Sequence, residues 1–452
     1  MIPTVPFEVE RGKAQRKRRR KERIMKNKTL NICMALAGIA LLAVFIWSAR
    51  SDGQAKVMDS KKVSSIADIV VPEVPNVTTD RPSGVITAEE WASYYPEIYA
   101  SYMKNAENYA AKGERTEYTE SNPDIQVLYQ GMAFSKDYGE AIGHNYTLDD
   151  IAATTRPHKL ANCLTCKTPD FTATVNSMGV GAYKVDFEEM YATVSEPVSC
   201  YNCHANTPGT MVITHDYMAN AMGGEIEANR VSASVVSCAQ CHIEYYFDPD
   251  TKATTAPYTG LDNMNPDDIL AFYNKIGYVD YTNENTGVGM LKVQHPEFET
   301  FMGEGSKHKG MYTCADCHMG VSYTDKGDPY ANHYLISPLQ NEELIRNTCS
   351  MCHTGDLELN ALVGTIQQRI TTRENEVSAL LVELNSKLAA AIEAGTLDQE
   401  TIDQAKTLDR NAQFYWDFIF VENSEGAHNS ALSEACLDKA EALANEALAL
   451  LK

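Results

Sequence analysis

Residues 161–170 read ANCLTCKTPD and hold one of five Cys-x-x-Cys pairs in a chain of 452 residues. In this pair Cys163 and Cys166 are followed by a lysine, Lys167. The other four pairs are each followed at once by histidine, in the stretches CYNCH at 200–204, CAQCH at 238–242, CADCH at 314–318 and CSMCH at 349–353. Ten of the 12 cysteines belong to the five pairs, and the two that do not are Cys33 and Cys436.

The repeated histidine separates the possible uses of such pairs. A disulfide framework has no need of histidine after every second cysteine, zinc sites combine the pairs two by two, and a thioredoxin-like site has a single pair. In Cys-x-x-Cys-His, two thiols bond covalently to a haem and the histidine ligates its iron. The pattern predicts five c-type haems, held by Cys163, Cys166, Lys167, Cys200, Cys203, His204, Cys238, Cys241, His242, Cys314, Cys317, His318, Cys349, Cys352 and His353.

The number of histidines suits four six-coordinate haems. The chain has 11 histidines, and four of them belong to the motifs. Four electron-transfer haems need four further axial ligands, and the remaining seven histidines are His144, His158, His215, His295, His308, His333 and His428. Spacing alone does not assign a histidine to an iron.

Lys167 stands where the other motifs carry their iron ligand. A lysine amine binds iron only in its neutral form, so the metal has to displace a proton. A motif that has lost its haem is the alternative, but both cysteines of this pair remain. A haem with an unusual proximal ligand and an open opposite face would be the natural catalytic centre, with the other four haems as electron carriers.

The charge of the chain is uneven. The net charge is −22, yet residues 1–30 hold 11 Lys and Arg against 3 Glu, whereas the remainder carries 28 basic and 58 acidic side chains. An acidic body repels phosphate, which argues against nucleic-acid binding. Surplus carboxylates of this kind usually form a solvated surface.

The chain divides into five parts. Residues 1–28 form a basic arm, and the uncharged stretch TLNICMALAGIALLAVFIWSA at 29–49 is long enough to span a bilayer as a helix. Basic residues before that stretch predict a cytoplasmic N-terminus and a body on the extracytoplasmic face. A cleaved signal peptide is the alternative, and it also exports the body. Residues 50–86 read as an extracytoplasmic stalk, 87–357 as the pentahaem catalytic body, and 358–452 as a long-helix region and candidate dimer face.

The fold class predicted is mainly α with many loops, a multihaem cytochrome c fold built around five haems with long C-terminal helices. Gly, Pro and Asn interrupt the body, so the porphyrins are expected to supply much of its apolar core. Beyond residue 358, apolar residues recur at helical spacing from Leu359 to Gly395. Further helices are predicted over Ile402–Phe420 and Ser430–Leu451.

One Cys-x-x-Cys-Lys followed by four Cys-x-x-Cys-His resembles the ammonia-forming pentahaem cytochrome c nitrite reductases. The stretches CAQCHIEYYF at 238–247 and KVQHPEFE at 292–299 resemble signatures of that family, and the similarity runs from about residue 94 to residue 430. The resemblance implies dissimilatory six-electron reduction of nitrite to ammonium, at a lysine-ligated haem fed by four bis-histidine haems. It also implies one calcium ion, and the long C-terminal helices predict a homodimer.

The resemblance assigns roles residue by residue. Lys167 is the proximal ligand of the active haem, and Arg156, Tyr245 and His295 line its open side. The calcium ligands are Glu244 and Gln294 by side chain, with Tyr245 and Lys292 by backbone carbonyl. The distal ligands are His333 for the second haem, His144 for the third, His428 for the fourth and His308 for the fifth. His158 and His215 receive no role.

These residue types suit the chemistry. Nitrite is an anion that approaches an acidic protein, so the pocket needs positive charge from Arg156, a protonated His295, iron and calcium. Arg156 would orient the anion. His295 and Tyr245 would donate the protons that each N–O cleavage requires. Calcium would fix the Tyr245 and His295 segments against each other.

Two other functions compete with nitrite reduction. A non-catalytic multihaem electron carrier would have every iron six-coordinate, which Lys167 disfavours. A related reductase of another nitrogen or sulfur oxyanion would share the fold, because substrate choice depends on the pocket. For the leading hypothesis, hydroxylamine, nitric oxide and sulfite are the candidate side substrates. The resemblance implies a membrane quinol-oxidising cytochrome as the electron donor, with another donor as the alternative.

Overall fold

The computed structural model describes residues 63, 65–72, 74, 76–107, 116–157, 159–354 and 358–452. The chain divides into two units, Met1–Lys62 and Val63–Lys452, and the fold below is that of the second unit. The predicted basic arm, anchor and first part of the stalk lie outside the described residues, as does His158. Within the described ranges, no helix is both long and apolar enough to cross a membrane.

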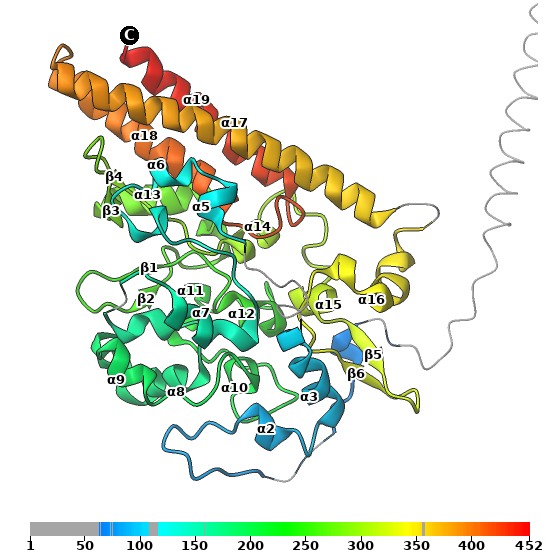
Figure 1. Cartoon of the computed structure of the whole chain (residues 1–452). Coiled ribbons are helices and arrows are strands. Elements are labelled where there is room, and N and C mark those ends of the chain that lie inside the picture. Colours follow the sequence, from blue (N-terminus) through cyan, green and yellow to red (C-terminus); the bar gives the residue numbers. More distant parts are fainter. Residues whose placement is uncertain are drawn as a thin grey trace, which may run out of the picture. The chain divides into compact units, whose positions relative to one another are not determined.

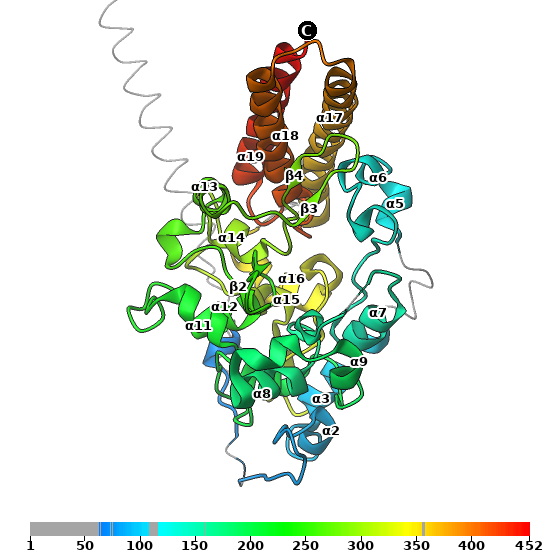
Figure 2. The ribbon, with the colours of Figure 1, turned by 90° about the vertical axis from the view of Figure 1, so that its left-hand side faces the viewer.

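Three long helices form the C-terminal part of the unit: α17 (Leu359–Ala394), α18 (Gln399–Phe420) and α19 (Ser430–Leu450). They lie side by side in both ribbon views (Figures 1 and 2). Gly395 ends α17 because it adopts the left-handed conformation, with φ of +61°, that glycine tolerates. Asp398 and Asn429 then begin α18 and α19 by accepting backbone hydrogen bonds at the next two N-termini.

The largest apolar core lies between these helices and the segments beneath them. From α17 it takes side chains at helical spacing, including Val377, Leu381, Leu384 and Leu388, and from α18 it takes the buried ring of Trp416. An amphipathic helix buries such a stripe against its neighbours. Burying each leucine contributes roughly 1.5–3 kcal/mol, so the stripe anchors α17 to the unit.

The haem-motif part of the chain is built from short helices and loops. Its α-helices are α2 (Ala88–Trp91), α3 (Pro96–Met103), α5 (Tyr118–Ser121), α6 (Ile125–Leu128), α7 (Thr147–Ala153), α8 (Pro169–Met178), α9 (Phe187–Tyr191), α10 (Cys200–His204), α11 (Asp216–Met222), α12 (Ala233–Ala239), α13 (Pro266–Ile276), α14 (Glu297–Met302), α15 (Cys314–His318) and α16 (Glu342–Asn347). Short 3-10 turns are η1 (Ile66–Asp68), η2 (Ala133–Ser135), η3 (His144–Tyr146), η4 (Ala161–Leu164), η5 (Gly179–Lys184), η6 (Leu261–Asn263), η7 (Pro338–Gln340) and η8 (Cys349–Met351). The mainly helical, loop-rich fold class predicted from the sequence is confirmed.

The strands of the described residues form two-stranded antiparallel ribbons. They pair as β1 (Tyr246–Phe247) with β2 (Thr254–Thr255), β3 (Tyr281–Thr282) with β4 (Gly289–Met290), and β5 (Val321–Tyr323) with β6 (Pro329–Ala331). In the first ribbon Tyr246 lies opposite Thr255, and in the second Tyr281 lies opposite Met290. The first two ribbons flank the residues predicted to bind calcium.

The described part of the predicted stalk packs on the body. The backbone N–H of Val63 donates to the Tyr323 hydroxyl at 2.9 Å, and the Ser65 hydroxyl donates to Asp316 at 2.8 Å. The Tyr95 hydroxyl donates to the Pro72 carbonyl at 3.3 Å. Contacts of the body therefore reach back to Val63, well before residue 87.

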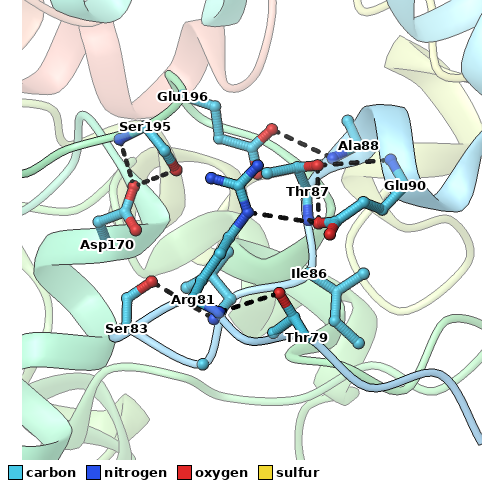
Figure 3. A network of polar contacts seen from close by, with 12 residues as sticks. Thr79, Arg81, Ser83, Ile86, Thr87, Ala88, Glu90, Asp170, Ser195 and Glu196 are labelled. Atoms are coloured by element: carbon cyan, nitrogen blue, oxygen red, sulfur yellow. Dashed lines mark hydrogen bonds and ion pairs between the residues drawn. The ribbon is translucent and has the colours of Figure 1, made fainter.

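A polar network fixes the chain where α2 begins (Figure 3). Thr87 and Glu90 cap the helix reciprocally, and the Arg81 guanidinium lies 3.5 Å from the Glu90 carboxylate. The Ala88 N–H donates to the Glu196 carboxylate at 3.1 Å. This last bond ties α2 to the segment that follows α9, close to the first Cys-x-x-Cys pair in the fold.

Candidate active site

Two of the five Cys-x-x-Cys motifs lie on single helical turns. CYNCH and CADCH coincide with α10 and α15, and reciprocal capping boxes begin both helices, from Ser199 with Asn202 and from Thr313 with Asp316. On a helix, residues at i, i+3 and i+4 share a face, so both thiols and the following ligand point the same way. None of the ten motif cysteines forms a disulfide, which leaves the thiols available for thioether bonds.

Near each motif histidine the structure places the histidine that the resemblance implies as the other axial ligand, and near His242 it also places His295. Two imidazoles that bind one metal at about 2 Å have ring centres roughly 6 Å apart. The ring-centre distances are 6.3 Å for His204 with His333, 6.4 Å for His242 with His144, 6.0 Å for His318 with His428 and 6.2 Å for His353 with His308. These are the same four pairs that the family resemblance implied, and each pair has the span that an iron between the rings requires.

Hydrogen bonds orient several of these rings. An imidazole whose Nδ1–H donates to an oxygen presents the Nε2 lone pair to a metal. The Nδ1–oxygen distances are 2.9 Å for His204 to the Thr210 carbonyl, 3.0 Å for His333 to the Ala331 carbonyl, 3.2 Å for His318 to the Ile336 carbonyl and 2.6 Å for His428 to the Glu422 carboxylate. In these four rings Nε2 is the nitrogen left for iron.

The thiols of different motifs lie close together. A hydrogen bond from Cys241, of the third motif, lowers the pKa of Cys166 in the first. A hydrogen bond from Cys314, of the fourth motif, is the largest influence on the pKa of Cys238, which falls to about 7. The third motif is thus adjacent to both the first and the fourth. Haems attached at these positions would be close neighbours, as electron transfer between them requires.

Lys167 follows Cys166 directly beyond the turn η4. Its backbone is fixed from two sides, because its N–H donates to the Leu164 carbonyl at 3.0 Å and its carbonyl accepts from the Thr147 hydroxyl at 2.7 Å. The side chain is half-buried. The lysine therefore occupies the same position relative to its cysteines as the ligand histidines of the other motifs.

Arg156 is held by a chain of hydrogen bonds. Its guanidinium lies 4.3 Å from the centre of the Phe134 ring, and its Nε–H donates to the Thr154 hydroxyl at 2.8 Å. The Thr154 hydroxyl donates in turn to the Asp137 carboxylate at 2.9 Å, and so does the Thr155 hydroxyl at 2.6 Å. Burial alone would raise the pKa of Asp137, but these hydrogen bonds and the Arg156 charge outweigh it and lower that pKa.

Tyr245 lies beside the first motif. Burial raises the pKa of its hydroxyl well above the usual range, the thiols of Cys166 and Cys163 act in the same direction, and Arg156 opposes them. The phenol therefore keeps its proton at neutral pH. Tyr245, Arg156 and the first Cys-x-x-Cys pair thus share one neighbourhood, as the resemblance implied.

His295 lies next to the third motif. Its ring centre is 6.2 Å from that of His242, and one carboxylate, Glu297, lies 3.8 Å from the Nδ1 of His295 and 3.7 Å from the Nδ1 of His242. Burial would raise the pKa of Glu297, but the two histidines hold it well below its usual range. The carboxylate is therefore ionised and balances positive charge on either ring.

The residues predicted to bind calcium also come together. The Glu244 side chain is buried, with Oε1 accepting from the Tyr273 hydroxyl at 2.8 Å and Oε2 accepting from the Gln294 N–H at 2.6 Å. The Gln294 side-chain amide lies 2.9 Å from the Lys292 carbonyl. Burial raises the pKa of Glu244 well above its usual range, and the nearby Glu299 and Asp280 carboxylates add to the rise.

This arrangement fits a calcium ion. Calcium prefers carboxylate, amide and carbonyl oxygens, which are the groups gathered here. A cation would relieve the electrostatic cost of the buried Glu244 charge. The Lys292 ammonium does not fill that role, because it is paired with Asp417 at 3.0 Å. In the part of the chain that the structure describes, no cluster of three or more His, Cys, Asp or Glu has a metal-binding arrangement.

Sequence reasoning missed two carboxylates at the site. Asp137 orients the Arg156 segment and Glu422 accepts from His428, but neither lies in a motif, so no local signal marks them. His215, which received no role, is buried, and its Nε2 lies 3.0 Å from the Thr165 carbonyl. That bond connects it to the turn between Cys163 and Cys166, which is a structural function.

Five Cys-x-x-Cys turns, four of them with facing histidines, define a multihaem c-type cytochrome. The chain belongs to the cytochrome c552 family, whose model matches residues 87–452.

A solved structure shares the fold over most of this chain. The catalytic subunit (NrfA) of the cytochrome c nitrite reductase from Desulfovibrio desulfuricans, which is described with two calcium sites, is 24% identical, with 82% of this chain and 87% of that chain covered and a TM-score of 0.73. The similarity is weaker to the outer cell wall cytochrome OcwA (18% identity, 71% and 49% covered, TM-score 0.36) and to an undecahaem cytochrome from the S-layer of Carboxydothermus ferrireducens (19%, 68% and 41%, TM-score 0.35).

Proposed function

We propose that the protein reduces nitrite to ammonium with six electrons, at a haem bound to Cys163 and Cys166 and ligated by Lys167. Membership of the cytochrome c552 family and the fold shared with a cytochrome c nitrite reductase support this function. The observation that carries the proposal is the neighbourhood of the first motif. It combines a lysine in the ligand position with an arginine and a protonated tyrosine.

The overall reaction consumes one nitrite, six electrons and eight protons, and it yields one ammonium ion and two water molecules. A haem held by Cys163, Cys166 and Lys167 would supply the electrons for this reduction. Arg156, aligned by Thr154 and Phe134, binds and orients the anion. Tyr245 and His295 donate protons to the departing oxygens, and Glu297 holds the charge that His295 gains when it is reprotonated.

Four bis-histidine haems supply the electrons in this proposal. Their ligand pairs are His204 with His333, His242 with His144, His318 with His428 and His353 with His308, and the ring spacings near 6 Å support each assignment. Nδ1 hydrogen bonds that leave Nε2 free support the ligand role further.

A calcium ion bound by Glu244, Gln294, Tyr245 and Lys292 stabilises the pocket in this proposal. The buried Glu244 carboxylate and the neighbouring oxygens support it. Because these ligands come from the segments that carry Tyr245 and His295, the ion would hold the two proton donors in fixed positions relative to each other.

The proposed enzyme is anchored to a membrane, receives electrons from a partner protein and forms a dimer. The uncharged stretch at 29–49 and the basic residues before it support an N-terminal anchor with the body on the extracytoplasmic face. A membrane quinol-oxidising cytochrome is the proposed donor, and a homodimer through the long C-terminal helices is the proposed assembly.

The stoichiometry of the reaction tests the function. Purified holoprotein, a reduced viologen dye and nitrite are combined without oxygen, and the dye oxidised and ammonium formed are both measured. We expect six electrons per ammonium. A fully haem-loaded protein that leaves nitrite untouched would refute the proposal, and turnover of sulfite in the same assay would favour the other oxyanion reductase.

A further inference from the structure

One carboxylate in the loop after α18 lies against a predicted haem ligand. The Glu422 side chain is fully buried, and its Oε1 is 2.6 Å from the Nδ1 of His428. Because the carboxylate accepts the Nδ1 proton, it makes the imidazole more electron-rich at Nε2.

A single loop holds the acid and the histidine together. Glu422 lies two residues beyond the end of α18, and its N–H donates to the Ile419 carbonyl at 3.1 Å. The Ser424 hydroxyl donates to Glu422 Oε2 at 2.6 Å, and its oxygen accepts the N–H of His428 at 3.0 Å. The serine therefore fixes the spacing between the carboxylate and the ligand before any haem is bound.

The other oriented ligands have weaker acceptors. His204, His333 and His318 donate to neutral backbone carbonyls at 2.9–3.2 Å. Glu297 lies 3.7 Å from the Nδ1 of His242, which is too long for a hydrogen bond. Charge-assisted hydrogen bonds are shorter and stronger than those to carbonyls, so the His428 ring is the most strongly polarised of the set.

We propose that Glu422 is a positioning residue that lowers the reduction potential of the haem at Cys314 and Cys317 by polarising its ligand His428. This inference rests on the proposed bis-histidine ligation of that haem. An electron-rich ligand and a buried negative charge both favour ferric over ferrous iron. The fourth haem then has a lower potential than the second, whose ligands both donate to carbonyls.

The test uses full-length holoprotein and Glu422→Gln. A redox titration followed by electron paramagnetic resonance reports each low-spin haem separately from activity. We expect the midpoint of one low-spin haem to move to higher potential and its g-values to change, while the others move less. Glu425→Gln is the matched control, because it removes the same charge from an exposed position on the same loop.

The outcomes are distinct. If Glu422→Gln carries five haems and titrates like Glu425→Gln, the proposal is overturned. If Glu422→Gln does not load haem, the Ser424→Ala variant tests the proposal instead. Ser424→Ala removes the hydroxyl that holds Glu422 and His428 together, so we expect a smaller shift of the same haem midpoint to higher potential. An unchanged midpoint in Ser424→Ala would also overturn the proposal. A wild-type protein that fails to reduce nitrite would refute the proposed function, whereas a shifted haem would still support the role of Glu422.

Discussion

At the residue scale, the orientation of the Arg156 guanidinium depends on residues that lie outside every sequence motif. A ring, a hydroxyl and a carboxylate define its direction, through Phe134, Thr154 and Asp137. A flexible arginine would bind nitrite in several orientations and lose entropy on binding. A preorganised guanidinium avoids much of that cost.

Asp137→Asn should therefore weaken nitrite binding. The amide lacks the charge that holds Thr154 and Thr155, so the alignment of Arg156 loosens. We expect the KM for nitrite to rise about fivefold, equivalent to about 1 kcal/mol, with a smaller change in kcat. Steady-state kinetics over a range of nitrite concentrations measures both constants. Asp149→Asn, at an exposed position, is the control, and an equal KM in the two variants would contradict the role of Asp137.

How far the sequence predicts the site follows from the kind of signal each residue gives. Covalent attachment and axial ligation restrict spacing, so the five motifs and Lys167 can be recognised without a structure. Arg156 and Tyr245 required a family resemblance. Asp137 and Glu422 gave no signal, because each acts through a contact that only the folded chain creates.

At the scale of the element, periodicity predicted the C-terminal helices well. The predicted segments at 402–420 and 430–451 correspond to α18 and α19, and α18 begins three residues earlier because Asp398 caps its N-terminus. The short helices of the haem-motif part were predicted only as short stretches. Their ends depend on local capping, as at Ser199 and Thr313, and on long-range packing.

Asp409 makes the stability of α18 depend on pH. The side chain is buried and its Oδ2 has no hydrogen-bond partner, so burial raises its pKa to about 7 from the ordinary value of 3.8. The folded state binds this proton more tightly than the unfolded state. The stabilisation is therefore complete below about pH 4 and is lost as the pH rises through 7, by an amount on the order of 4 kcal/mol.

Asp409→Asn should remove this pH dependence. The amide has no charge to bury, so we expect the free energy of unfolding to fall less between pH 4 and 7 than in the wild type. Denaturant titration of the holoprotein at several pH values measures it. Asp403→Asn, on the exposed side of the same helix, should keep the wild-type slope. Equal slopes in all three proteins would show that Asp409 is not the group responsible.

At the scale of the whole molecule, distant segments meet at the predicted calcium site. Glu244 lies just before β1, whereas Lys292 and Gln294 follow β4, and an ion would connect them. The sequence could indicate such a site only by resemblance, because its amide and carbonyl ligands have no spacing rule. The predicted stalk is a similar case, since its packing on Tyr323 and Asp316 depends on residues far along the chain.

Removing calcium should impair catalysis more than haem binding. Without the ion, the buried Glu244 carboxylate has to take up a proton, and the segments of Tyr245 and His295 lose their connection. We expect a chelator to lower nitrite reduction severalfold at unchanged haem absorbance, and added calcium to restore it. Glu244→Gln should be insensitive to the chelator. Parallel loss of activity and haem would instead make the ion a folding element.

The position of the third Cys-x-x-Cys motif affects electron transfer among all the predicted haems. Its thiols lie near those of the first, second and fourth motifs, whereas the fifth motif is near the fourth, through Cys349 and Cys317. Among these thiol contacts, the third motif is the junction that links the first motif to the other three. Loss of the fifth haem would leave the other four haems connected to one another. Loss of the third haem would leave three unconnected parts, namely the first haem, the second haem, and the fourth with the fifth, so the first haem would lose its supply of electrons.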